Sequence, residues 1–333
     1  MGILTSACGQ SDTGSVQGAE AGSGSELEAG SESEATSASE AGSESGTADA
    51  GAAYDSTAVD AAGAFDSSAS SMVESGMESA VADTGSGAWW IPAKNTTFYW
   101  DLAGAPPDNT KAVGAYDIDG WNNTASEVMM LHAQGMKVVC YMDVGSYEPS
   151  RPDSNAFPAS LKGQPVQGWP GEFWLDVRPS GPNHSILQSI LLARFKVCQS
   201  KGFDAVEPDN MDSYQNTPGF PTSAADQIAF NEWVAQTVHG LGMAVFQKND
   251  LAQIPTLVTY FDGILDEQCN QYAECATLAP YTAANKPVWN AEYMGGTTFC
   301  NADVNAGIVG ALFALNLDGS VFQPCSNDIG RIH

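Results

Sequence analysis

Short apolar runs alternate with longer segments of helical character from Trp89 onward, and this alternation constrains the fold more than any other feature. Runs that suit buried parallel strands span residues 98–102, 113–118, 137–144, 203–207, 243–247, 261–267, 287–291 and 310–315. Helical segments separate them at residues 124–134, 185–200, 223–241, 250–259, 275–284 and 301–307. Eight strands with intervening helices predict an α/β fold of the (β/α)8 type, a TIM barrel, over residues 88–333. A doubly wound open sheet is the alternative, disfavoured because no G-x-G-x-x-G motif follows a predicted strand.

The first 87 residues differ sharply in composition from the rest. They contain 15 of the 40 acidic residues and no Lys or Arg, within a chain of formal net charge −28. With few large apolar side chains they cannot bury enough surface to offset the entropy of ordering. We therefore predict that residues 1–87 form a disordered acidic linker rich in Ser, Gly and Glu.

The sequence around Cys8 resembles the end of a bacterial lipoprotein signal, with small residues before the cysteine. A basic segment and a full apolar core are missing from this match. Two interpretations stay open: Cys8 is a lipid anchor that tethers the protein to a membrane, or it is an isolated cysteine in the linker.

Six further cysteines lie in the predicted barrel, and an even number favours disulfides in an exported protein, extracellular or held at the cell surface. Cys269 and Cys275 flank a short loop that a disulfide would close, and we also pair Cys300 with Cys325. Cys140 and Cys198 are left as a third disulfide or two buried thiols. No C-x2-C spacing occurs, which disfavours a zinc site, and we predict no metal and no cofactor.

Acidic and aromatic residues gather where the predicted strands end, the position at which barrel enzymes carry their catalytic groups. In the segment 202–214, Glu207, Asp209 and Asp212 follow a short apolar run that Pro208 is expected to end. A solvated acidic loop is the alternative for this segment. Glycoside cleavage needs one carboxyl group that protonates the leaving oxygen and another that attacks or activates water. Asp209 and Glu267, two strands apart in the predicted ring, are the candidate catalytic pair.

Other residues at the strand ends are candidates for binding the substrate. Lys248 is expected to keep Asp209 ionised. Tyrosines and a tryptophan could stack on sugar rings, and some of the aspartates either bind substrate or hydrogen-bond loop backbone. The candidate binding residues are Tyr116, Asp117, Asp119, Tyr141, Asp143, Glu148, Arg151, Trp174, Glu207, Asn210, Tyr214, Lys248, Asn249, Glu292 and Tyr293.

Several motifs occur in the same order as in a known enzyme family. The motifs are Tyr116-Asp-Ile-Asp119, Cys140-Tyr-Met-Asp-Val-Gly-Ser-Tyr-Glu148, Arg151-Pro-Asp153, Gly171-Glu-Phe-Trp-Leu-Asp-Val-Arg178, Gly202-Phe-Asp-Ala-Val-Glu-Pro-Asp-Asn210, Lys248-Asn249, Glu267-Gln-Cys269, Lys286-Pro-Val288 and Glu292-Tyr293. Together they resemble the endo-α-1,4-polygalactosaminidases, glycoside hydrolase family 114. The match covers nearly all of residues 89–292 and departs from the usual pattern at Met142 and Asp143.

This resemblance implies a TIM-barrel hydrolase that cuts α-1,4-linked galactosamine polymers. It also implies catalytic roles for the aspartate of E-P-D-N and the glutamate of E-Q-C, which are Asp209 and Glu267. The expected partner is a cationic galactosamine-rich polysaccharide, because an acidic cleft attracts amines, whereas nucleic acid needs Lys and Arg. We expect a monomer, and we favour retention over inversion of the anomeric configuration.

Two other functions compete with this one. A barrel could bind a cationic cell-wall or biofilm polysaccharide without cutting it, although both candidate carboxylates are present. A metal-dependent deacetylase is disfavoured, because the chain has only four histidines and three of them lie in segments of helical or loop character.

Overall fold

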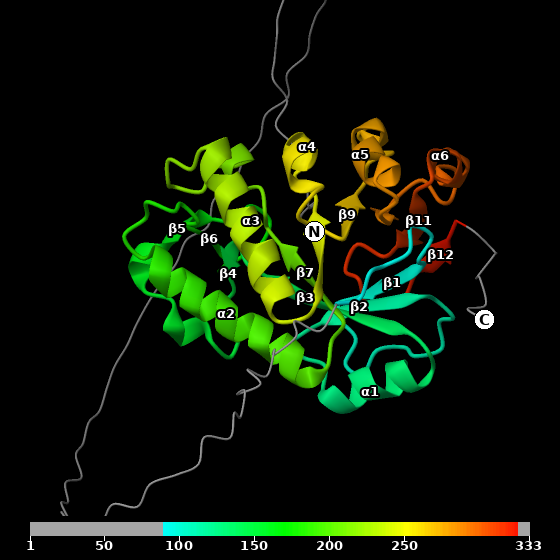
Figure 1. Cartoon of the computed structure of the whole chain (residues 1–333), viewed down its shortest axis with the longest axis horizontal. Coiled ribbons are helices and arrows are strands. Elements are labelled where there is room, and N and C mark those ends of the chain that lie inside the picture. The colour runs from blue at the N-terminus through cyan, green and yellow to red at the C-terminus, as the bar shows by residue number, and fades with distance from the viewer. Residues whose placement is uncertain (1–88, 326–333) are drawn as a thin grey trace, which may run out of the picture. The chain divides into compact units, whose positions relative to one another are not determined.

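The computed structural model describes residues 89–325, so the predictions for the linker and for Cys8 lie outside the described residues. Eight parallel strands form the centre of the structure, each within two residues of a predicted start (Figure 1). They are β1 (Phe98–Asp101), β2 (Ala115–Asp119), β3 (Lys137–Asp143), β7 (Ala205–Asp209), β8 (Ala244–Lys248), β9 (Gly263–Glu267), β10 (Val288–Glu292) and β11 (Val309–Phe313). Their pairing follows chain order from β1 to β11, as the barrel prediction requires.

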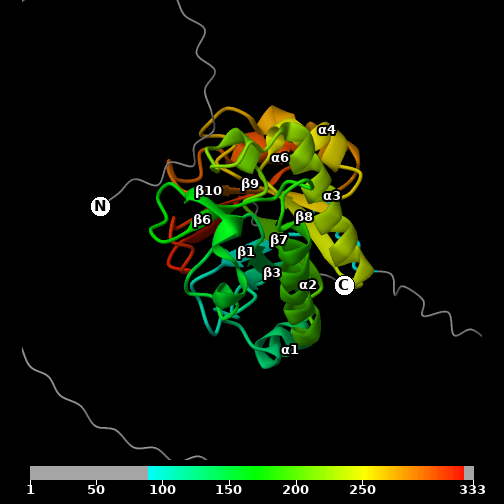
Figure 2. The same cartoon turned by 90° about the vertical axis from the view of Figure 1, so that its left-hand side faces the viewer.

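Helices follow six of these strands. They are α1 (Ala125–Ala133), α2 (His184–Lys201), α3 (Ala224–Gly240), α4 (Ile254–Leu257), α5 (Ala279–Ala283) and α6 (Cys300–Ala306), with short 3-10 turns Leu251–Gln253 and Cys275–Leu278 ahead of α4 and α5. The N-terminus of α3 is fixed by a capping box, in which Ser223 and Asp226 satisfy each other's backbone N–H groups. Rings of Phe195 and Trp233 meet where α2 and α3 lie side by side (Figures 1 and 2).

A ninth strand, β12 (Phe322–Pro324), pairs antiparallel with the free edge of β11. Its Phe322 ring contacts both Phe313 of β11 and Tyr99 of β1, so β12 lies at the seam between the first and last parallel strands. Leu317 closes the seam further by accepting backbone hydrogen bonds from Leu102 and Ala103. The sequence did not predict this strand, because three residues are too few to show a period.

The insertion after β3 contains its own sheet. Strands β4 (Ser146–Tyr147), β6 (Phe173–Leu175) and β5 (Lys162–Pro165) pair antiparallel in that order, with 3-10 turns at Ser154–Ala156 and Ala159–Leu161. This small sheet lies beside the barrel (Figure 1).

Pro208 does not end strand β7, contrary to our prediction. On the β3 side the pairing continues through Met142 with Pro208 to Asp143 with Asp209. On the β8 side the paired register ends at Val206 with Val245, before Pro208 is reached. The missing N–H of Pro208 therefore interrupts no hydrogen bond of that pairing. Asp209 is therefore held on the end of a strand rather than in a loop.

All six cysteines of the barrel form disulfides. The predicted pairs Cys269–Cys275 and Cys300–Cys325 are confirmed, and Cys140 of β3 pairs with Cys198 of α2. This third pair settles the alternative left open above in favour of a disulfide. Within residues 89–325, no helix combines the length and the apolar character that a membrane span requires.

Candidate active site

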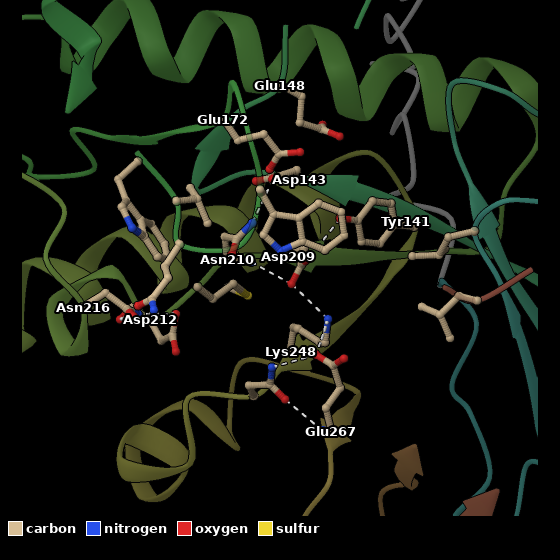
Figure 3. A pocket seen from close by; sticks show the side chains of 18 of the residues that line it. Tyr141, Asp143, Glu148, Glu172, Asp209, Asn210, Asp212, Asn216, Lys248 and Glu267 are labelled. Carbon is tan, nitrogen blue, oxygen red and sulfur yellow. Dashed lines mark hydrogen bonds and ion pairs between the residues drawn. The ribbon is translucent and has the colours of Figure 1, made fainter. Parts of the chain in front are cut away.

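A cavity of about 860 Å³ opens at the carboxyl ends of the parallel strands. Among residues 89–325, seven carboxyl groups line it and only two cations, Arg151 and Lys248. Twelve of the seventeen candidate residues are on its wall: Asp119, Tyr141, Asp143, Glu148, Arg151, Trp174, Asp209, Asn210, Lys248, Asn249, Glu267 and Tyr293. The position at strand ends therefore brings most of the predicted residues together (Figure 3).

Asp209 is surrounded by hydrogen-bond donors. Its Oδ1 accepts from Lys248 Nζ at 2.9 Å and from the backbone N–H of Asn210 at 2.8 Å, and its Oδ2 accepts from the Tyr141 hydroxyl at 2.9 Å. Burial alone would raise the pKa of Asp209, but the charge of Lys248 and these three donors hold that pKa below its usual value. Asp209 is thus ionised, as expected from its lysine neighbour.

Glu267 faces the same lysine from strand β9. Its Oε2 lies 3.1 Å from Lys248 Nζ and accepts a hydrogen bond from the Asn249 amide at 3.1 Å. Its Oε1 accepts a short hydrogen bond from the Tyr293 hydroxyl. Both oxygens of Glu267 are therefore oriented by side chains that come from two neighbouring strands.

Lys248 joins the two candidate catalytic groups. Since its Nζ is 2.9 Å from Asp209 Oδ1 and 3.1 Å from Glu267 Oε2, those two oxygens are at most 6.0 Å apart. The lysine side chain is only 3% exposed, and its ammonium lies 4.8 Å from the centre of the Trp100 ring. Burial disfavours the charge of Lys248, yet the surrounding carboxylates hold its pKa well above the usual value.

Left-handed backbone turns follow the three strands that carry these groups. Asn210, Asn249 and Gln268 have φ values of 61°, 46° and 67° directly after Asp209, Lys248 and Glu267. Asparagine tolerates this conformation better than most residues. Each of these turns directly follows a residue that lines the cavity.

Two further aspartates hold the loops around the cavity. Asp143 accepts hydrogen bonds from the backbone of Gly145 and Ser146 and from the amide of Asn210 at 2.8 Å. Asp119 accepts from the backbone of Trp121 and Asn122. Of the two roles considered for these residues, the structure shows the bonding to loop backbone.

Arg151 lies on the cavity wall between two acidic residues. Its guanidinium lies 2.6 Å from Asp119 Oδ2 and 2.6 Å from Glu148 Oε1. The positive charge of Arg151 is therefore already paired within the protein, as is that of Lys248.

Five predicted residues do not line the cavity. The Tyr116 hydroxyl bonds to the backbone of Asp108 and Lys111, the Tyr214 hydroxyl bonds to Asp250, and Glu292 accepts from the backbone of Asn270. Asp117 and Glu207 lie below the cavity floor with 0% exposure. The polar groups of these side chains are thus turned into the protein rather than toward the cavity.

The list of candidate residues left out other residues of the wall, chiefly Glu172, Asp212 and Trp169. Burial and the charge of Glu148 raise the pKa of Glu172 to about 7, and burial and the charge of Asp209 raise that of Asp212 to about 6. No cation lies within salt-bridge distance of either carboxyl among residues 89–325. Asp212 had a sequence signal, because it follows the E-P-D-N segment by two residues.

Comparison with known proteins gives the family. The model of glycoside hydrolase family GH114 matches residues 79–330. This chain belongs to family GH114. The crystal structure of Ega3 from Aspergillus fumigatus in complex with galactosamine is 32% identical to this GH114 chain, covering 69% of it and 96% of Ega3, with a TM-score of 0.64.

The glycoside hydrolase domain of PelA from Pseudomonas aeruginosa has the same fold, at 15% identity and a TM-score of 0.53 over 68% of the GH114 chain and 97% of the domain. Among curated proteins, none matches. The family and the fold make this GH114 chain a TIM-barrel glycosidase, which confirms the fold class and the enzyme class predicted from the sequence.

Proposed function

We propose that this GH114 glycosidase cleaves α-1,4-linked galactosamine polymers internally, with Asp209 as the nucleophile and Glu267 as the acid/base. The observation that carries the proposal is the pair of carboxyl groups held by one buried lysine at the floor of an acid-lined cavity. The galactosamine complex of the 32% identical Ega3 supports the choice of sugar.

The charge of the cavity supports a cationic substrate. Seven carboxyl groups face two cations, and both cations are already bound to acids of the protein. Among the described residues, Asp143, Glu172 and Asp212 are the cavity acids without such a partner. Asp143 is already hydrogen-bonded to the backbone of Gly145 and Ser146 and to the amide of Asn210, so an ammonium group of the sugar would supply the counter-charge that Glu172 and Asp212 lack. An N-acetylated sugar has no charge to offer at these positions.

The geometry favours retention of the anomeric configuration. Retaining enzymes hold their two carboxyl groups about 5–5.5 Å apart, whereas inverting enzymes need about 6.5–9.5 Å to admit a water. The bound of 6.0 Å between Asp209 Oδ1 and Glu267 Oε2 falls short of the inverting range.

The two steps then follow from the positions of the groups. Asp209 attacks the anomeric carbon while Glu267 gives its proton to the departing glycosidic oxygen, which leaves a glycosyl ester on Asp209. Glu267, now a carboxylate, removes a proton from water, and the hydroxyl displaces Asp209 from the same carbon. The donors around Asp209 keep it ionised before the attack and receive it again as the leaving group.

We also propose that the protein acts outside the cell, since three disulfides form and persist in oxidising compartments. The acidity of the cavity supports the cationic substrate, and these disulfides support the extracellular location.

The experiment compares purified wild-type protein with Asp209→Asn and Glu267→Gln on partly acetylated galactosamine polymer. We expect the wild type to release oligosaccharides and each variant to lose at least about a thousandfold in kcat, with proton NMR of early products showing the retained anomer. Chitosan, which carries the same amine on a different sugar, serves as the control substrate. A Glu267→Gln protein with full turnover would remove the acid/base assignment, and an inverted first product would remove Asp209 as nucleophile.

A further inference from the structure

Two buried carboxyl groups beneath the catalytic pair take no part in the steps above. Asp117 on β2 and Glu207 on β7 both have 0% exposure. Among residues 89–325, no N–H or O–H group forms a hydrogen bond with any of their four side-chain oxygens. Two ionised carboxylates in such a place would be strongly destabilising, because burial without a donor costs free energy for each charge.

The two groups are close enough to satisfy each other. The carboxyl of Asp117 is within hydrogen-bonding reach of the carboxyl of Glu207, and that contact becomes a hydrogen bond only when one of them carries a proton. Burial is the main cause that raises the pKa of Asp117 to about 8. Burial and then the charge of Asp117 raise the pKa of Glu207 well above its usual value.

The nearest cation is the lysine that serves the catalytic groups. Lys248 Nζ lies 3.4 Å from Glu207 Oε1, compared with 2.9 Å from Asp209 and 3.1 Å from Glu267. One ammonium group therefore faces three carboxyl groups. An ionised Glu207 would compete with Asp209 for it, whereas a protonated Glu207 would not.

We propose that Asp117 and Glu207 share a proton, and that this protonated pair leaves the Lys248 ammonium group bound to Asp209 and Glu267. Glu207 is thus a positioning residue that acts through Lys248 and does not touch the substrate. The proposal rests on the catalytic roles given above to Asp209 and Glu267. Loss of the shared proton at alkaline pH draws the ammonium toward Glu207 and leaves Asp209 less well oriented.

The other ionisable groups around the pair come from five elements. Tyr141 approaches from β3, Asp209 from the end of β7, Lys248 from β8, Glu267 from β9 and Tyr293 from the segment after β10. Of these five groups, Lys248 alone is a cation, and the tyrosines stay neutral because burial raises their pKa values well above the usual value.

The kinetic test compares Glu207→Gln with Glu207→Leu. Glutamine keeps the shape and a donor hydrogen and cannot ionise, so it imitates the shared-proton state, whereas leucine removes the hydrogen bond to Asp117. We expect Glu207→Leu to lose at least about tenfold more kcat than Glu207→Gln, and we expect the alkaline fall of kcat to move to higher pH in Glu207→Gln. Equal losses in both variants, or an alkaline limb identical to that of the wild type, would overturn the proposal.

A spectroscopic test needs no substrate, and its deciding measurement is made on the wild-type protein. Carbon-13 carboxyl NMR of wild-type protein labelled at glutamate should show a carboxyl group that stays protonated at slightly alkaline pH, and the Glu207→Gln spectrum should lack it. A wild-type spectrum in which every glutamate is ionised under those conditions would overturn the proposal. If the wild type does not cut galactosamine polymer, the proposed function fails, while this measurement still decides whether the pair holds a proton.

Discussion

The hydroxyl group of Tyr141 donates a hydrogen bond of 2.9 Å to Oδ2 of Asp209 across the β3–β7 pairing. This bond stabilises the ionised carboxylate and contributes to its low pKa. The residue was a candidate for stacking on a sugar ring, and the structure places its hydroxyl on the candidate nucleophile.

Tyr141→Phe tests this contact. A hydrogen bond to a charged group is worth about 1.5–3 kcal/mol, so we expect kcat to fall about 10- to 100-fold. Because the lost donor favoured the ionised form, the pKa of Asp209 rises, and the acidic limb of kcat/KM moves to higher pH. Tyr116→Phe is the matched control, since Tyr116 bonds to loop backbone away from the cavity and its loss should leave kcat unchanged. An equal fall in both variants would contradict the assignment.

Lys248→Met tests the central cation. Removing it leaves Asp209 and Glu267 facing each other without a counter-charge, so the pKa of Asp209 rises and this proposed nucleophile becomes protonated at neutral pH. We expect kcat to fall by at least about a thousandfold. Breaking a buried ion pair from one side costs about 3–5 kcal/mol, which urea unfolding at neutral pH should show as lost stability. The stability loss should shrink at acidic pH, where the carboxyl groups are protonated, and a constant loss across pH would count against this explanation.

The fold and the central site were predictable because both depend on strand ends. Parallel strands place their carboxyl ends on one rim, so Asp209 and Glu267 could be assigned to one cavity from their positions after apolar runs. What strand ends do not reveal is which side of a strand faces the cavity. Tyr116 and Asp117 are neighbours on β2, and one bonds to an outer loop while the other lies buried beneath the cavity floor.

Residues of the insertion were missed for a different reason. Glu172 reaches the cavity because the adjoining strand β6 pairs with β4 and β5, and these strands have two to four residues each. Runs this short have no readable period, so the sequence does not say which side chains of the insertion point into the cavity.

Glu172→Gln and Asp212→Asn test the binding of ammonium groups. Both carboxyl groups have raised pKa values, about 7 and about 6, so they are increasingly protonated as the pH falls through that window. We expect KM for a deacetylated polymer to rise below about pH 7 in the wild type. Each variant should raise KM about 5- to 50-fold at neutral pH with little change for acetylated polymer.

Glu232→Gln, which removes one acid from helix α3 outside the cavity, is the control for net charge. Added salt should raise KM of the wild type more than that of either cavity variant, because salt screens the attraction between the acids and the amines. If all three substitutions change KM equally, the substrate is attracted by the overall negative charge of the protein rather than by specific contacts at Glu172 and Asp212.

Gly145→Ala tests how tightly the loop after β3 must pack against Asp209, the proposed nucleophile. A Cβ at Gly145 would lie 1.8 Å from the backbone oxygen of Asn210, and the N–H of Gly145 donates to the carbonyl of Asp209 at 3.2 Å. The methyl group must therefore push the two segments apart and move Asp209 relative to Lys248. We expect kcat to fall at least about 100-fold, since a displacement of about 1 Å costs that much in a preorganised site, with a loss of about 1–3 kcal/mol in stability.

Gly240→Ala is the matched control, because that glycine ends helix α3 with open space around it and alanine there should stabilise the protein by up to about 1 kcal/mol. Kinetics and urea unfolding of the two variants side by side separate the effect of packing at the site from the effect of replacing a glycine, and a Gly145→Ala enzyme with wild-type kcat would show that the loop is free to yield.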